Sequence, residues 1–78
     1  MLEKIREIIR NHAGLAVDLA SLSDDADLWV AGMTSHASVS VMLALEATFH
    51  VEFPERMLSS DAFASVSAIR SALTELGA

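Results

Sequence analysis

Residues 35–50 read SHASVSVMLALEATFH and contain neither proline nor glycine, so nothing in this stretch interrupts a helix. Its apolar side chains cover more than one face of that helix. A helix that is apolar nearly all round is buried on several sides or presents an apolar surface to a partner, and both can hold for one helix. The next residues, VEFP at 51–54, end the helix, because proline disfavours helical geometry in the residue before it.

Apolar side chains at helical spacing predict a first helix over residues 1–13 and a last helix over 65–76. These side chains are Leu2, Ile5, Ile8, Ile9, Val66, Ile69, Leu73 and Leu76. Gly14 and Gly77 follow the two segments in the position of C-terminal caps. A short helix within 55–62 completes the expected architecture, an all-α four-helix bundle.

Residues 14–34 separate the first two helices and are predicted to form a long ordered loop. The stretch carries Ser and Asp side chains typical of turns, but also isolated apolar residues that can pin it over a bundle. The predicted anchors are Leu15, Val17, Leu19, Leu22, Leu28 and Trp29. Trp29, the only tryptophan, is expected to be largely buried, and its competing role is to stack on a ligand.

The length of 78 residues fits a single domain, predicted over 1–78, because a second hydrophobic core would have too few side chains to bury. The chain has no cysteine, which excludes disulfides and thiolate zinc sites. The first residues contain no apolar signal or membrane-spanning run. We therefore expect a cytoplasmic protein with no membrane partner.

The net charge of −6 is concentrated in the middle of the chain, where no Lys or Arg balances the acidic residues. These are Asp18, Asp24, Asp25, Asp27, Glu46, Glu52 and Glu55. Phosphate binding needs concentrated positive charge, so a nucleic acid is excluded as the expected partner. A basic protein or a cationic groove suits this field better, although the aspartates can equally form a solvated loop.

Residues 27–39, DLWVAGMTSHASV, followed by MLALE at 42–46 and by Phe49, resemble the acyl and peptidyl carrier proteins. In that family a D-L-x-x-x-G-x-D-S-L run opens the second helix, which continues as V-x-x-x-M-x-L-E-x-x-F. The spaced match extends through residues 51–54 and 63–66. The resemblance places Ser35 on the serine that receives 4′-phosphopantetheine from coenzyme A. It implies an acyl-carrier-protein-like bundle that is no enzyme and holds acyl or aminoacyl cargo as a thioester.

The resemblance also implies three partners for a monomeric carrier. A phosphopantetheinyl transferase attaches the arm, a separate ATP-dependent ligase activates the acyl or amino acid cargo, and a downstream transferase receives it. Thr34 and His36 depart from the family, which has aspartate and leucine there, so a selective modifying enzyme is expected. The run from Thr34 to Val39 is similar to a bacterial subgroup of discrete carriers. Ligases resembling truncated seryl-tRNA synthetases load that subgroup with an amino acid.

The predicted partner-binding residues lie around Ser35 and along the central helix. They are Thr34, His36, Val39, Met42, Leu43 and Met57, and core packing is the alternative role for the methionines and Leu43. Family members of fatty acid synthesis add acidic residues to this region, whereas this chain has Ser38, Ser40, Ala47 and Thr48. The expected contact is therefore more apolar and less salt-sensitive.

Local sequence leaves other roles open for Ser35 and its neighbours. Ser35 could be only a helix N-cap, or Thr34 could be the cap and leave the Ser35 hydroxyl outward. Catalysis by Ser35 with His36 is disfavoured, because adjacent helical residues diverge by about 100° and no orienting acid is evident. No metal site is expected from His12, His36 and His50, whose spacing matches no ligand motif. The rival functions are an unmodified carrier-like protein-interaction module and a helical regulator unrelated to carriers.

Overall fold

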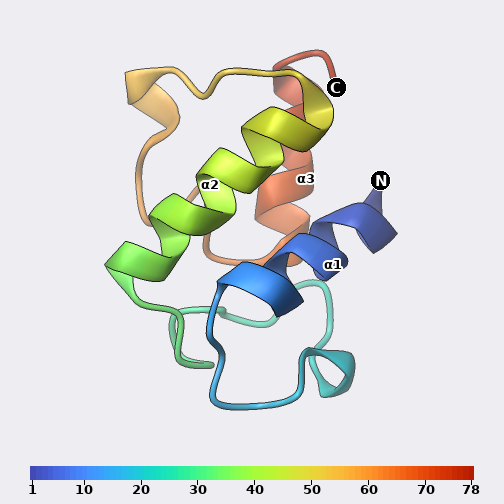
Figure 1. Ribbon diagram of the computed structural model, residues 1–78, viewed down its shortest axis with the longest axis vertical. Coiled ribbons are helices and arrows are strands. Elements are labelled where there is room, and N and C mark those ends of the chain that lie inside the picture. The colour runs from blue at the N-terminus through green and yellow to red at the C-terminus, as the bar shows by residue number, and fades with distance from the viewer.

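The computed structural model describes residues 1–78 and is all-helical (Figure 1). It contains α1 (Leu2–His12), α2 (Ser35–Phe49) and α3 (Val66–Glu75), with two short 3₁₀ turns, η1 (Leu19–Ser21) and η2 (Glu55–Met57). The helices predicted over 1–13, 35–50 and 65–76 are confirmed to within one residue at each end. Gly14 and Gly77 follow α1 and α3 with positive φ, which suits the left-handed conformation after a helix.

The predicted fourth helix is not confirmed, because residues 55–62 form only the 3₁₀ turn η2 followed by turns. Leu58 leaves helical geometry at φ −90° and ψ 50°. The next residues, Ser59, Ser60 and Asp61, have side chains that compete for backbone hydrogen bonds and favour turns over helix interiors. The bundle therefore has three α-helices, and an irregular segment joins α2 to α3.

The core lies where α1 packs against both α2 and α3. Its fully buried side chains are Ile5, Ile9, Leu28, Val41, Leu45, Val66, Ile69 and Leu73. Each contributes about 1.5–3 kcal/mol by leaving water. Of α2, only Val41 and Leu45 are buried, so the other sides of this apolar helix are partly or fully open to solvent. The central helix is therefore buried on one side only and exposes apolar side chains such as Val39 and Leu43 on another.

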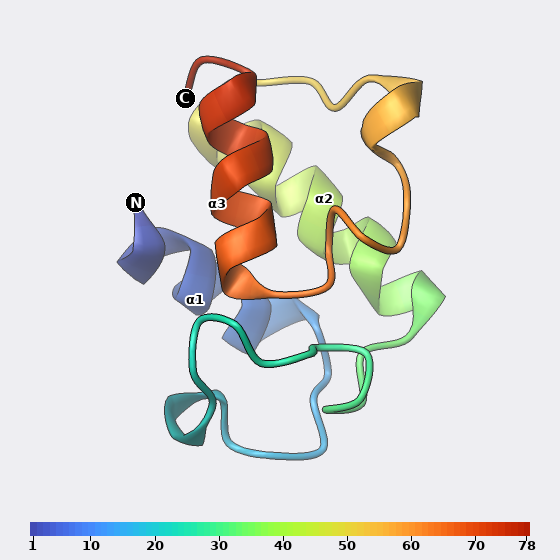
Figure 2. The ribbon, with the colours of Figure 1, turned by 180° about the vertical axis from the view of Figure 1, so that it is seen from behind.

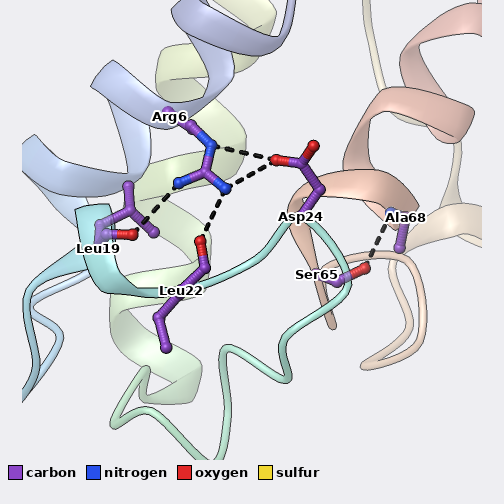
Figure 3. Close-up of polar contacts among 6 residues, drawn as sticks. All are labelled: Arg6, Leu19, Leu22, Asp24, Ser65 and Ala68. Carbon is purple, nitrogen blue, oxygen red and sulfur yellow. Dashed lines mark hydrogen bonds and ion pairs between the residues drawn. The ribbon is translucent and has the colours of Figure 1, made fainter.

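The long loop between α1 and α2 is ordered, as predicted, and runs along the lower ends of α1 and α3 (Figure 2). The Arg6 guanidinium of α1 binds its first half, donating to the Leu19 and Leu22 carbonyls and to the Asp24 carboxylate (Figure 3). The Asp24 carbonyl in turn accepts from the Ser67 amide of α3 at 2.9 Å. The Arg6 side chain thus joins α1 to the loop, and the backbone of Asp24 joins the loop to α3.

The predicted loop anchors do not all behave alike. Leu19 and Leu28 are buried, and Leu15, Leu22 and Trp29 are half-buried against the core. Val17 is exposed, so its prediction as an anchor is wrong.

None of the helices combines the length and the apolar character that crossing a membrane requires.

Candidate functional site

The start of α2 determines what the Ser35 hydroxyl is free to do. Thr34 is the N-cap, with extended backbone geometry, and its hydroxyl accepts a hydrogen bond from the Ala37 amide at 3.1 Å. Ser35 is the first helical residue and is exposed. The carbonyl of Ser35 accepts from the Ser38 hydroxyl at 2.7 Å, while its own hydroxyl is not used as a cap. Of the two boundaries left open by the sequence, the structure has the one that leaves Ser35 outward.

The same helix start offers a place for an anion. The Ala37 and Ser38 amides are bonded to Thr34, which leaves the Ser35 and His36 amides of the first turn without a helical partner. The positive end of the dipole of a 15-residue helix lies at this point. An exposed hydroxyl beside free amides fits a phosphodiester on Ser35.

Hydrogen bonds and a close backbone approach define the turn that leads into α2. The Asp27 carboxylate accepts from the amides of Trp29 at 2.8 Å and Val30 at 3.2 Å. Gly32 has φ +115°, and a Cβ at this position would lie 3.0 Å from the Ala16 backbone nitrogen, so only glycine fits. This turn explains the Asp and Gly of the family motif as backbone devices that fix where Ser35 is presented.

A groove of about 320 Å³ lies beside Ser35, between α2 and the segment that follows η2. It is lined by Trp29, Ser35, Ser38, Val39, Met42, Leu58, Ser59, Ser60 and Phe63. Trp29 is half-buried rather than largely buried, because part of its ring faces this groove. Its indole Nε1 donates to the Ser60 carbonyl at 2.9 Å. This bond connects the turn before α2 to the segment that follows η2.

We expect Trp29→Phe to lower the free energy of unfolding by about 1 kcal/mol, because a smaller aromatic ring replaces the indole and the hydrogen bond to Ser60 is lost. For a domain of this size that is a fall in Tm of about 4–8 °C, measurable by circular dichroism. An unchanged Tm would show that the bond between the two segments does not stabilise the fold in solution.

The predicted partner-binding residues fall into two groups. Thr34 and His36 are exposed around Ser35, Val39 and Leu43 are 50% and 56% exposed along α2, and Met42 is half-buried. Met57 is buried and packs in the core, which is its alternative role, since η2 turns this side chain inward. Leu58, the next residue, is exposed and lines the groove instead. Sequence reasoning missed Leu58 because a residue in a turn has no periodicity that assigns it to a face.

Several acidic groups predicted to steer partners are used inside the protein. The Asp24 carboxylate pairs with Arg6, Asp27 holds the turn before α2, and a Glu46 carboxylate oxygen accepts from the Phe53 amide at 2.8 Å. Glu46 is the only charged residue of α2. The exposed face of this helix therefore carries almost no free charge.

Comparison with known proteins decides the family. The phosphopantetheine attachment site family matches residues 3–73. The chain belongs to this family. The resemblance to carrier proteins is thereby confirmed, and phosphopantetheine is the cofactor of the family. The residues of this chain fit phosphopantetheine, because the exposed Ser35 hydroxyl, two free backbone amides and a groove lie together at the start of α2.

Relatives narrow the similarity within the family. The chain is 43% identical over 65 residues to an aminoacyl carrier protein of Agrobacterium fabrum, covering 83% of this chain and 78% of that protein. It is also similar to a chain in a crystal structure of an engineered Bradyrhizobium japonicum glycine:[carrier protein] ligase complexed with a carrier protein from Agrobacterium tumefaciens and AMP. The TM-score is 0.92 at 39% identity, over 95% of this chain and 99% of that one. A solution structure from Agrobacterium tumefaciens has a TM-score of 0.76 at 39% identity, over 96% and 90% of the chains.

Proposed function

We propose that this protein is a non-catalytic aminoacyl carrier, with phosphopantetheine attached to Ser35 and a separate ATP-dependent ligase that loads it. The observation that carries the proposal is the exposed Ser35 hydroxyl, which Thr34 frees from capping at the start of α2. The aminoacyl carrier protein at 43% identity and the carrier complexed with a glycine ligase support an amino acid as cargo.

Attachment needs only this hydroxyl from the chain. The Ser35 oxygen forms a bond to the pantetheine-bearing phosphorus of coenzyme A, the bond from that phosphorus to the nucleotide breaks, and the hydroxyl proton passes to a base of the transferase. The phosphodiester that results lies beside the free amides of the first turn of α2. When bound, the arm supplies the thiol that carries the cargo as a thioester. Tethering then raises the local concentration of the cargo at each partner enzyme.

The rival function, an unmodified interaction module, requires Ser35 to be only a cap. Thr34 provides that cap, so the rival leaves an exposed serine without a structural role. Catalysis is disfavoured for the reason already given, and His36 and His50 lie about 21 Å apart along α2, too far to share a metal ion. A single carrier domain over 1–78, acting as a monomer in the cytoplasm and delivering to a downstream transferase, completes the proposal.

Loading of the modified protein tests the cargo. The protein carrying the arm is incubated with ATP, an amino acid:[carrier protein] ligase and single amino acids, and its intact mass is measured. We expect a mass gain equal to one aminoacyl group, which neutral hydroxylamine removes because a thioester is labile to it. A parallel incubation supplies ATP, an acyl-activating ligase and fatty acids instead, and a protein that carries the arm but is loaded only in that incubation would contradict the proposed cargo.

Docking of the ligase on the exposed face of α2 gives a separate prediction. Leu43→Asp should raise the KM for loading about tenfold, because it puts a charge into a contact that relies on apolar burial. Since α2 carries little free charge, the KM of the unchanged protein should vary by less than about threefold between low and high salt.

The matched control for Leu43→Asp is Thr74→Asp, which adds the same charge to an exposed position of α3. We expect Thr74→Asp to leave the KM unchanged. Equal effects of the two substitutions, or a KM that rises steeply with salt, would show that general electrostatics rather than the α2 face determines docking.

A further inference from the structure

The two residues that flank Ser35 change the charge beside it, and both changes favour an anion. Thr34 stands where the family motif has aspartate, and His36 stands where it has leucine. The first change removes a negative charge, and the second adds a positive charge whenever the imidazole is protonated. We propose that His36, in its protonated form, pairs with the phosphodiester on Ser35 and makes the attachment of the arm to α2 sensitive to pH. The proposal rests on the attachment to Ser35 proposed above.

The free amides of the first turn draw the phosphodiester toward the end of α2. Because the Ser35 and His36 amides have no helical partner, a phosphate that they bind lies over the end of the helix. Side chains of an α-helix tilt toward its N-terminus, so the His36 side chain can reach the same end. His36 is exposed, and no ion pair within the protein occupies its ring. The imidazole is therefore available to the phosphodiester.

The divergence of adjacent helical side chains, which disfavours catalysis by Ser35 with His36, does not prevent this pairing. Transfer of a proton from the hydroxyl to the imidazole requires a directed hydrogen bond of about 2.6–3.2 Å. Attraction between two whole charges has no such direction and acts within about 4–6 Å. The phosphate also extends the Ser35 side chain beyond its hydroxyl oxygen, which brings negative oxygens within reach of the neighbouring ring.

Few of the charged groups around the start of α2 change charge near neutral pH. On α2 itself, the residues three and four positions after His36 are uncharged, and the only charged residue is Glu46. The elements around this end contribute acidic residues from the loop and from the segment after η2, and two basic residues from the last turn of α1: Asp18, Asp24, Asp25, Asp27, Asp61, Arg10 and His12. Aspartate and arginine keep their charge between pH 5 and 8, so His12 is the one member of this set that titrates in the same range as His36.

The pairing forms and breaks within the range in which histidine titrates. A histidine side chain changes its charge between about pH 5 and 8, whereas a phosphodiester stays anionic throughout that range. The contact is therefore present at the lower end of the range and is lost as the pH rises and the imidazole gives up its proton. Above that range the phosphodiester keeps only the two free amides as partners. The arm is thus held more firmly to α2 at low pH than at high pH.

Phosphorus NMR of the modified protein tests the pairing, after mass spectrometry has verified that the arm is attached. Since the phosphodiester does not itself titrate between about pH 5 and 8, its resonance should move with pH only if a neighbouring group does. We expect a movement with its midpoint in this range. His36→Leu, which restores the residue of the family motif, should remove the movement, and so should His36→Gln, which keeps a polar side chain without the charge. The matched control is His12→Gln, which removes an exposed histidine of α1 and should retain the full movement.

Thermal unfolding of the unsubstituted protein gives a second readout that needs no variant. Modification should raise Tm by about 2–4 °C more at about pH 5.5 than at about pH 8, because an exposed charge pair stabilises weakly and only while the histidine is charged. A phosphorus resonance that does not move with pH in fully modified protein, or a movement that survives in His36→Leu or disappears in His12→Gln, would overturn the pairing and leave attachment to Ser35 standing. Failure of Ser35 to accept the arm would instead overturn both proposals, and the mass spectrum separates the two outcomes.

Discussion

Ser35→Ala is expected to abolish attachment of phosphopantetheine completely while leaving the fold intact. The hydroxyl that would bond to phosphorus is lost, and no other group replaces it. Stability should change by less than about 0.5 kcal/mol, because Thr34 continues to cap α2 and alanine is well suited to a helix. The measurement is the intact mass after incubation with coenzyme A and a phosphopantetheinyl transferase, together with thermal unfolding of the variant.

Two controls separate the chemistry of Ser35 from the structure around it. Ser40→Ala removes a hydroxyl further along α2 and should still gain the arm. Thr34→Ala should lose about 1 kcal/mol of stability through the missing cap but retain the modified hydroxyl. A mass gain in Ser35→Ala would place the arm on another residue. Unfolding of Ser35→Ala would show that this serine has the structural role that Thr34 is assigned here.

The helices were predictable because their patterns are local. An uninterrupted run over 35–50 and apolar residues at helical spacing near both ends are sufficient to locate three helices. The short segment 55–62 contains no such repeat, and there Leu58 and the serines after it favour turns. The short helix predicted within 55–62 is therefore not confirmed, and only the 3₁₀ turn η2 forms there.

The functional site was predictable only in part. The motif identified Ser35, but the boundary between N-cap and first helical residue depends on which hydroxyl bonds to the Ala37 amide, and Thr34 and Ser35 are both capable of it. The groove was not predictable, because Trp29, Leu58 and Ser60 come from segments that only the tertiary fold brings together. The internal partners of the acidic residues were likewise not predictable, because Asp24 pairs with Arg6 and Glu46 accepts from the Phe53 amide across long stretches of sequence or a turn.

Arg6 makes the largest contribution to stability that we expect from a residue whose role the sequence did not predict. It is one of several charged residues on the polar face of α1, and nothing in its spacing points to a partner 18 residues away. The structure gives it four donor contacts, two to Asp24 Oδ1 at 2.7 and 3.1 Å and one each to the carbonyls of Leu19 and Leu22. Its side chain is only 27% exposed, so these bonds are partly shielded from water.

Arg6→Ala should lower the free energy of unfolding by about 2–3 kcal/mol, because two loop carbonyls and a carboxylate lose a charged donor together. That is a large share of a total stability of about 5–15 kcal/mol, and Tm should fall by about 10–20 °C. Arg6→Lys should recover part of the loss, since an ammonium keeps the charge but cannot reach all of these acceptors in the plane of a guanidinium. Thermal and urea unfolding measure both changes.

The matched control is Arg56→Ala, because Arg56 also pairs with a carboxylate, that of Glu75, but at 3.5 Å and with both side chains largely exposed. We expect it to change stability by less than about 0.5 kcal/mol. Hydrogen exchange adds a local test, since Arg6→Ala should speed exchange of the Ser67 amide, which is bonded to the Asp24 carbonyl. Equal losses from the two arginine substitutions would show that charge alone matters. A selective loss from Arg6→Ala would show that Arg6 holds in place the loop that leads to Ser35.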